Sequence, residues 1–327
     1  MPSHRSDPMP MKRIFLSILW VFLFTSCNLP APSTPTEQAL VLTPTQPIPT
    51  ATAGFTPTSL PTETLIPPSL TPTPIPCDPL TADYCIIDWG FLFQRPILPP
   101  GEDLADLTYL YATTQNGARD PHHGVEFQNA FGTPVHAAAA GEVVFADSDK
   151  STRFSPWTNF YGNVIIIRHA DEMYTLYAHL SAILVQAGDQ VEVGDMIGQV
   201  GATGGATGSH LHFEVREGSD YTDYFSTQNP ELWLIPKSDT GTLSITLAMD
   251  SERNYERPLV VTRLIDGNAV FTYYLSSYAR GFEHNEEDAV LGSLPPGEYK
   301  IQFNAPSGLR ERIVPLEAGR LTQVVFK

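Results

Sequence analysis

The sequence predicts an all-β protein in which an antiparallel β-sheet core is followed by a second, small β-sandwich domain. Between residues 88 and 236, short runs of β-branched and aromatic residues such as Asn163–Arg168 and Tyr174–Ala178 are bounded by glycine, aspartate and asparagine. No stripe of apolar residues at helical spacing extends over three turns there. From about residue 240 to residue 327, alternating runs such as Leu243–Leu247 recur between turn signals. We therefore expect two consecutive β domains.

The composition restricts the partners of the chain. Its 327 residues include 36 Asp and Glu against 19 Lys and Arg, a formal net charge of −17. A protein that binds nucleic acid needs a basic surface to neutralise phosphates. The charge therefore excludes a nucleic-acid partner and is typical of an acidic exported protein.

The N-terminus has the pattern of an export signal. A basic start at Met11-Lys-Arg precedes an apolar run, Ile14–Phe24, that is too short to span a bilayer comfortably. The run leads into Phe-Thr-Ser-Cys, which resembles the lipobox of bacterial lipoprotein signal peptides, although Phe stands where Leu or Val is commoner. The resemblance implies that residues 1–26 are a signal peptide, that Cys27 receives the lipid, and that the protein is exported to the cell envelope and held on the outer face of a membrane as a lipoprotein. An ordinary signal peptide or an N-terminal anchor is the alternative, and either Met1 or Met11 can be the start.

A linker and a pair of cysteines follow. Residues 27–76 are rich in proline and threonine and contain no lysine or arginine. Such a segment has too little apolar surface to fold, and its prolines favour extended conformations, so we expect a disordered stalk. Cys77 and Cys85 are eight residues apart in an exported context, and with Cys27 they make an odd total of three. We expect these two to form a disulfide while Cys27 has a separate fate.

The C-terminal region, residues 240–327, carries no cluster of catalytic residue types. Its turns, such as Leu294-Pro-Pro-Gly-Glu-Tyr299, resemble those of transthyretin-like or carboxypeptidase-regulatory-like β-sandwich modules. His284 is the only histidine there, and we interpret it as an ordinary loop residue.

Histidines are concentrated in three short motifs of the region before it. His122-His-Gly-Val-Glu126 places a histidine and a carboxylate four residues apart, and Tyr177-Ala-His-Leu-Ser181 ends a strand-like run. In His210-Leu-His-Phe-Glu214, read as a strand, the two histidines and the glutamate share one face. Two imidazoles on one face can approach one metal ion, and a catalytic zinc typically has three protein ligands and one open position.

Together the motifs resemble those of the lysostaphin-like, LytM-type zinc endopeptidases. The match also includes Gly132-Thr-Pro-Val, Gly141-Glu-Val, Gly162-Asn-Val and Val191–Gly201, and covers about residues 121–216. The resemblance implies a peptidase domain over residues 77–236, with an N-terminal extension, that hydrolyses peptide bonds of bacterial peptidoglycan. It implies one Zn²⁺ per chain with His122, Glu126 and His212 as ligands. It also implies that His179 and His210 are catalytic residues that do not bind the metal.

One position departs from the family pattern: Glu126 stands where the family has Asp. Glu is one methylene longer but binds zinc in other metallopeptidases. The departure leaves open a catalytically weakened LytM-type binding protein that regulates another cell-wall hydrolase. A third hypothesis is a structural surface lipoprotein whose β-sandwich binds cell wall. The cleaved bond, the ligand of the second domain and the oligomeric state are not predicted.

Other motifs are less informative. We expect His123, His136 and His169 to have packing or surface roles rather than to bind metal. The run Gly201–Gly208 lacks the Lys-Ser/Thr of a phosphate-binding loop, so a tight glycine loop that leads into the next strand is favoured. The run Val185–Gly201 resembles the hairpins of lipoyl carriers but lacks their lysine.

Overall fold

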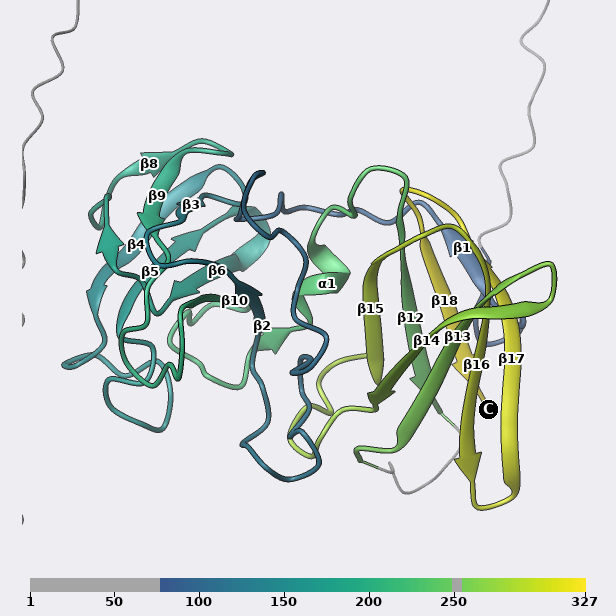
Figure 1. Ribbon diagram of the computed structural model, residues 1–327. Helices are drawn as coiled ribbons and strands as arrows, with labels where there is room; N and C mark the ends of the chain where they lie inside the picture. Colours follow the sequence, from purple (N-terminus) through teal and green to yellow (C-terminus); the bar gives the residue numbers. More distant parts are fainter. Residues whose placement is uncertain (1–76, 249–254) are drawn as a thin grey trace, which may run out of the picture. The chain divides into compact units, whose positions relative to one another are not determined.

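The computed structural model describes residues 77–248 and 255–327, which lie within one compact unit, Thr71–Lys327. The expected signal peptide, Cys27 and the stalk of residues 27–76 lie outside the described residues. Within the described ranges, β-strands and connecting loops predominate, and the all-β prediction is confirmed (Figure 1). None of the described helices has the length and apolar character needed to cross a membrane.

The first domain is built on a seven-stranded antiparallel sheet. Six of its strands have the order β11-β10-β6-β5-β4-β8, and the seventh, β2, pairs with the first half of β10, residues 210–213. Apolar side chains cover both faces of its middle, one around Ile165 and Phe213 and the other around Ile166 and Leu176. Because both faces are buried, the central strand β5 is almost entirely apolar. The strands are β2 (Val125–Gln128), β4 (Gly141–Ser148), β5 (Asn163–Arg168), β6 (Met173–Ala178), β8 (Gln190–Val191), β10 (His210–Glu217) and β11 (Thr227–Gln228).

A smaller three-stranded sheet, in the order β3-β9-β7, accompanies the large one. Val135, Leu180 and Ile197 from this part of the chain join the same core as the large sheet. Its strands are β3 (Pro134–His136), β7 (Ala182–Ile183) and β9 (Met196–Gln199), and a short 3-10 helix, η1 (Ala170–Glu172), links β5 to β6.

The second domain consists of two four-stranded sheets that share a core of apolar side chains, including Leu243, Val261, Tyr299 and Phe326. One sheet has the order β1-β18-β12-β15 and the other β14-β13-β16-β17. This arrangement is a β-sandwich. The strands are β1 (Cys85–Ile87), β12 (Gly241–Leu247), β13 (Pro258–Ile265), β14 (Asn268–Ser276), β15 (Ala289–Leu294), β16 (Gly297–Ala305), β17 (Gly308–Leu316) and β18 (Leu321–Phe326).

The N-terminal end of the described chain adds a strand to a sheet of the second domain. Cys77 and Cys85 form a disulfide, and β1, which begins at Cys85, pairs antiparallel with β18. One part of the expected N-terminal extension of the peptidase domain, strand β1, therefore pairs with the second domain. Sequence position alone could not show it, because β18 lies more than 200 residues further along the chain.

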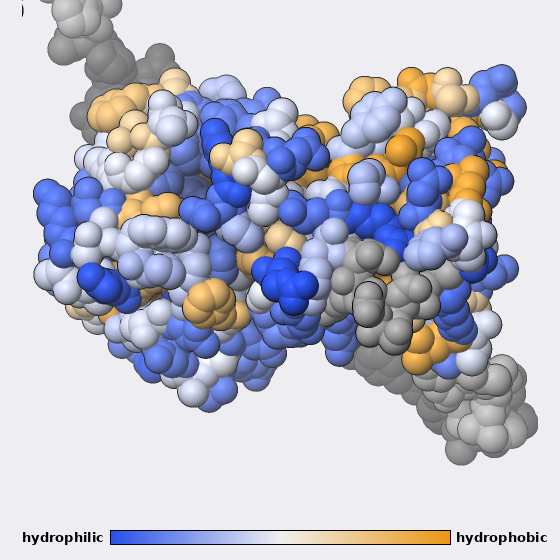
Figure 2. Space-filling model, turned by 90° about the horizontal axis from the view of Figure 1, so that it is seen from below, coloured by the Kyte–Doolittle hydropathy of each residue, from blue (hydrophilic) through white to orange (hydrophobic). Residues whose placement is uncertain are grey.

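The two domains are joined by specific buried contacts. The short helix α1 (Pro230–Trp233) lies between the sheets of the first domain and strand β15 of the second (Figure 1). Its Glu231 forms a buried ion pair with Arg95 at 3.2 Å, and Arg95 also donates to Ser293 Oγ at 2.8 Å. Tyr278 and Phe282, from the loop between β14 and β15, are buried in the core of the first domain. The surface drawn in Figure 2 is mostly hydrophilic, with hydrophobic residues in small separate groups.

Candidate metal centre

The pairing of β2 with β10 brings the first candidate ligands together. In this antiparallel pair Glu126 lies directly opposite His212, so both side chains emerge on the same face of adjacent strands. His122 comes from the segment just before β2. Gly124 allows the close approach of this segment, because a Cβ there would lie 2.4 Å from the carbonyl oxygen of Phe213 and 3.0 Å from the His212 ring.

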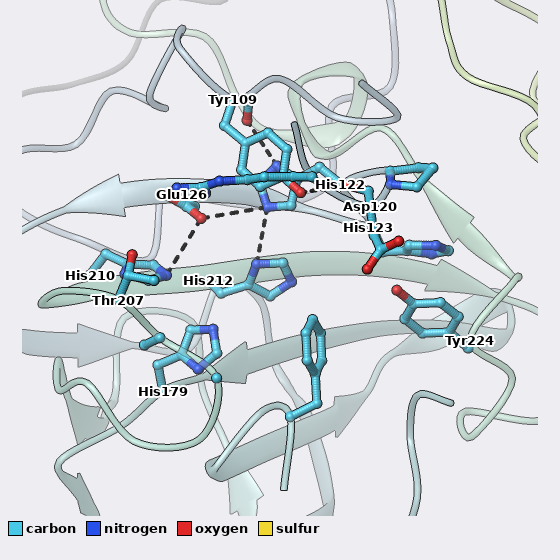
Figure 3. Close-up of a pocket in the computed structure, with 15 residues that line it drawn as sticks. Tyr109, Asp120, His122, His123, Glu126, His179, Thr207, His210, His212 and Tyr224 are labelled. Atoms are coloured by element: carbon cyan, nitrogen blue, oxygen red, sulfur yellow. Dashed lines mark hydrogen bonds and ion pairs between the residues drawn. The ribbon is translucent and has the colours of Figure 1, made fainter. Parts of the chain in front are cut away.

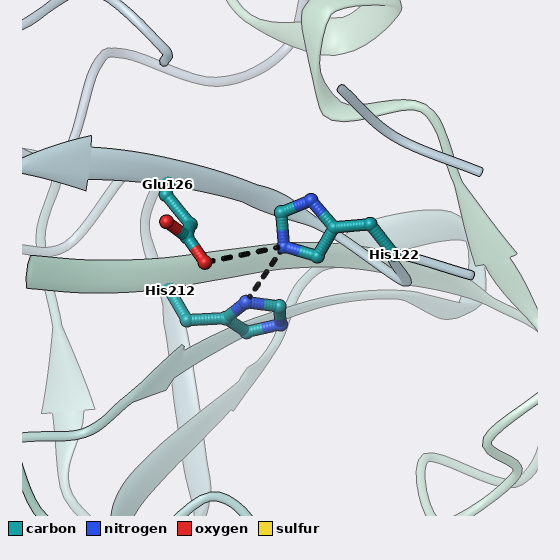
Figure 4. A group of neighbouring side chains, drawn as sticks. All are labelled: His122, Glu126 and His212. Atoms are coloured by element: carbon teal, nitrogen blue, oxygen red, sulfur yellow. Dashed lines mark hydrogen bonds and ion pairs between the residues drawn. The ribbon is translucent and has the colours of Figure 1, made fainter. Parts of the chain in front are cut away.

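Three potential ligand atoms converge at this point (Figure 4). One nitrogen or oxygen from each of His122, Glu126 and His212 lies within 4.8 Å of the others. His122 Nε2 is 3.2 Å from His212 Nδ1 and 4.0 Å from Glu126 Oε1. In a tetrahedral zinc site with Zn–N bonds of about 2.0–2.1 Å, two ligand nitrogens are about 3.3 Å apart. The spacing of the two imidazole nitrogens fits such a site.

The outer hydrogen bonds of the two histidines leave lone pairs on the inner nitrogens. His122 Nδ1 lies 2.8 Å from the carbonyl oxygen of Tyr109, which can only accept, so Nδ1 carries the proton. His212 Nε2 lies 3.0 Å from the carboxylate of Glu214 and carries its proton for the same reason. Two unprotonated nitrogens therefore face each other. Burial, and secondly His212, lower the pKa of His122 well below its usual value, so a proton between the rings is disfavoured. A metal cation satisfies both lone pairs.

Glu214 links this site to a fully buried polar network. Its Oε1 accepts from His212 Nε2 at 3.0 Å and from the Tyr161 hydroxyl at 2.5 Å. Its Oε2 accepts from Arg216 Nε at 2.8 Å, and neither side chain is exposed. Burial opposes the ionisation of Glu214, but Arg216 and His212 outweigh it and hold the Glu214 pKa at about 2. The carboxylate is therefore ionised and fixes the orientation of the His212 ring.

His179 and His210 stand beside the three ligand candidates (Figure 3). Their rings are 4.8 Å apart, and that of His179 is 5.7 Å from His212. His179 Nδ1 donates to the carbonyl of Thr203 at 2.9 Å, and His210 Nδ1 donates to that of Gly208 at 3.0 Å. Both rings therefore keep an unprotonated Nε2. His179 holds a left-handed backbone conformation with φ of 63°, which costs free energy and is typical of functional positions.

Burial keeps these histidines uncharged at neutral pH. It lowers the pKa of His179 to about 3, with contributions from His212 and His210, and it lowers the pKa of His210 as well. Neutral imidazoles can bind a metal or accept a proton, whereas protonated ones can do neither.

The site opens into a cavity of about 270 Å³, and the sequence did not mark Tyr109, Arg119 or Tyr224 as parts of its wall. Tyr109 stacks on His122 with centroids 4.0 Å apart, and the Arg119 guanidinium lies 4.8 Å from the centroid of the same Tyr109 ring. Tyr224 and Asp120 lie next to His123 (Figure 3). Gly205, Ala206 and Thr207 of the glycine loop form a further part of the wall, as the expected tight loop leads into β10.

The histidines expected to have lesser roles lie in different places. His123 lines the cavity, where it stacks on Tyr224 at 3.6 Å and contacts Phe282 of the second domain at 4.8 Å. His136 and His169 lie outside the cavity and bond to carbonyl oxygens of Gly194 and Ala140. His284 lies in the loop between β14 and β15, as expected, and its Nε2 donates to the carbonyl of Thr227 at 2.7 Å.

Comparisons with known proteins match the part of the chain that carries the site. Residues 120–224 match the family described as peptidase family M23. Over 95 residues the chain is 44% identical to the DD-carboxypeptidase/endopeptidase Mpg of Neisseria meningitidis serogroup B. Over the same length it is 42% identical to the peptidoglycan DD-endopeptidase ShyA of Vibrio cholerae. Each match covers 29% of this chain and 20% of the relative. The catalytic domain of the antimicrobial peptidase lysostaphin from Staphylococcus simulans is 34% identical, over 37% of this chain and 86% of that chain, with a TM-score of 0.31. The chain thus spans about a fifth of the length of the two curated relatives.

Proposed function

Since residues 120–224 form a domain of peptidase family M23, we propose that the chain is a zinc-dependent endopeptidase that hydrolyses peptide bonds in bacterial peptidoglycan. The observation that carries the proposal is the set of His122 Nε2, His212 Nδ1 and the Glu126 carboxylate, which presents two lone pairs and a negative charge to one point. One relative is named a DD-carboxypeptidase/endopeptidase and another a peptidoglycan DD-endopeptidase, which supports a peptide of the cell wall as the substrate.

The donor set suits one zinc ion, with His122, Glu126 and His212 as its ligands and one position open. Bound there, zinc would polarise the scissile carbonyl and lower the pKa of a bound water. The chain's own part is to orient the ligands and to move protons. Glu214 and the Tyr109 carbonyl hold the two ligand rings in the required tautomers.

His179 and His210 are the proton-transfer residues in this proposal. The unprotonated Nε2 of either ring can accept the proton of the attacking water as a general base. Once protonated, the same Nε2–H can donate to the developing oxyanion or return the proton to the leaving amine. Removal of either imidazole should lower the rate by about 10²–10⁴-fold, the usual contribution of a positioned acid or base.

The test is digestion of purified peptidoglycan by the full protein with and without a chelator, followed by mass analysis of the products. We expect new amino and carboxyl ends from peptide cleavage, their loss after chelation, and their return with zinc. His122→Ala should lose both zinc and activity, whereas His179→Ala and His210→Ala should keep zinc. A metal-loaded protein that binds peptidoglycan without cutting it would support the regulatory alternative instead.

The domain organisation and location are part of the proposal. Residues 1–26 would be the signal peptide and 27–76 a stalk that lifts the peptidase off the membrane, while the sandwich of residues 240–327 would be a further domain. The lipobox-like sequence before Cys27 supports a lipid anchor. Membrane fractions should contain the native protein, and Cys27→Ser should be released or misprocessed. A Cys27→Ser protein that stays in the membrane with the same processed mass would rule out the lipid.

A further inference from the structure

Arg119 is the one lysine or arginine among the described residues that line the metal cavity. Its side chain is exposed, and the guanidinium lies 4.8 Å from the centroid of the Tyr109 ring, which itself stacks on His122. Among residues 77–248 and 255–327 it forms no ion pair, although several other arginines there do. A guanidinium with no carboxylate partner in these ranges thus lies one ring away from a candidate metal ligand.

The segment that carries Arg119 is fixed by the rest of the fold. The Arg119 backbone donates to the carbonyl of Thr114 at 3.0 Å, and Gly117 N donates to the Thr114 hydroxyl oxygen at 2.7 Å. Thr114 is in turn held by the carboxylate of Glu256 from the second domain, which accepts from its backbone N at 3.0 Å and from its hydroxyl. A backbone anchored in this way reduces the entropy that Arg119 would lose on binding a ligand.

The other charges of the cavity are acidic and do not neutralise this guanidinium. Glu126 accepts from Gln128 Nε2 at 2.9 Å and faces His210 Nε2 at 3.6 Å. Asp120 lies toward His123 and Tyr224 (Figure 3). Arg119 and His210 line the same cavity. Among the described residues that line the cavity, Arg119 is therefore the one cationic side chain that can attract an anionic group.

We infer that Arg119 is a specificity-determining residue that binds a carboxylate of the peptide substrate close to the scissile bond. The inference rests on the proposed peptidase function and narrows its substrates to peptides that carry a free carboxylate at this place. A guanidinium binds a carboxylate through two parallel N–H···O bonds, so it distinguishes a carboxylate from a carboxamide by both charge and geometry. The Tyr109 ring supports the planar group from below through a cation–π contact.

The test uses two synthetic stem-peptide dimers that are identical except that the carboxyl group next to the cleaved bond is free in one and amidated in the other. Full-length wild type should cleave the free acid with a kcat/KM about 10–100-fold higher, the value expected for hydrogen bonds to a charged group. Arg119→Gln should remove this preference by lowering the value for the acid while that for the amide stays constant. Arg119→Lys, which keeps the charge but not the paired geometry, should retain part of it.

Arg153→Gln is the matched control, because Arg153 is also exposed on the first domain but does not line the cavity. Its acid-to-amide ratio should equal that of wild type. An Arg119→Gln ratio equal to that of wild type would overturn the inference, as would an equal loss on both substrates, since a structural defect does not discriminate between them. Failure of wild type to cleave either dimer or intact peptidoglycan would instead contradict the proposed function itself.

Discussion

Replacement of Glu214 by glutamine tests whether the buried network prepares the metal ligand. Glu214 is acceptor-only at both oxygens: Oε1 accepts from His212 and Tyr161, and Oε2 accepts from Arg216. A glutamine has one oxygen and one NH₂ group. If the NH₂ faces Arg216, two donors oppose each other in a fully buried place. If it faces His212, the ring must accept at Nε2 and carry its proton on Nδ1, where the metal lone pair is needed.

The first arrangement lowers the free energy of unfolding, and the second weakens metal binding. Removal of one partner from a buried ion pair costs about 3–5 kcal/mol of the free energy of unfolding, and the amide oxygen can recover part of this. Loss of an outer hydrogen bond to a metal-binding histidine typically weakens metal binding by about 10–100-fold. We expect Glu214→Gln to be destabilised by about 3 kcal/mol without metal and to bind zinc at least about tenfold more weakly.

The measurements are urea unfolding of the metal-free proteins and zinc titration in competition with a chelating dye. Glu217→Gln is the matched control, because Glu217 lies on the same strand, carries the same change and is exposed. The control should match wild type in both measurements. A Glu214→Gln protein with normal stability and normal zinc affinity would show that the network does not orient His212.

The site and the disulfide support three more predictions. Glu126→Ala should lose zinc. Glu126→Asp should not bind zinc more tightly than wild type, because Glu126 Oε1 is already 4.0 Å from His122 Nε2 and a shorter side chain would hold its oxygen further away. A large gain in zinc affinity and wall hydrolysis from Glu126→Asp would identify a degenerate site. Denatured, unreduced protein carrying Cys27→Ser should show no free thiol, and Cys85→Ser should lower the stability by roughly 2–3 kcal/mol in the chain-entropy model. Burial, then His212 and His210, lower the pKa of His179 to about 3. The free energy of unfolding of the metal-free protein should therefore fall as the pH drops below about 6.5, where this histidine gains its proton in the unfolded chain, by up to about 1.4 kcal/mol per pH unit. Urea unfolding at about pH 7.5 and 5.5 should show a smaller pH dependence for His179→Asn than for wild type.

Local patterns made much of the site predictable from the sequence. The side-chain period of two along a strand predicts His210, His212 and Glu214 on one face, and these residues lie in β10 as expected. The resemblance of the motif around His122 and Glu126 to the LytM-type pattern implied the other two ligand candidates. The register that sets Glu126 opposite His212 was not readable, because it depends on which strands pair and not on either strand alone.

The rest of the cavity depends on contacts between distant segments. Tyr109 and Arg119 lie in a loop without periodic pattern, so nothing in their neighbourhood marked them as neighbours of His122. The sequence predicted the sandwich as a domain. It did not predict that β1 belongs to one of its sheets, because β1 has only three residues. Short edge strands of this kind carry little sequence signal.

The loop between β14 and β15 of the second domain also packs against His123, which lines the metal cavity. Phe282 contacts the His123 ring at 4.8 Å, and His284 bonds to the carbonyl of Thr227, whose hydroxyl lies 3.3 Å from His123 Nδ1. Tyr278, buried in the same core, accepts from Asn229 Nδ2 at 2.8 Å. Buried aromatic contacts and paired buried polar groups make an interface that is costly to open. Within the described residues, the sandwich is therefore a domain that packs against the first one, and not a module on a free linker.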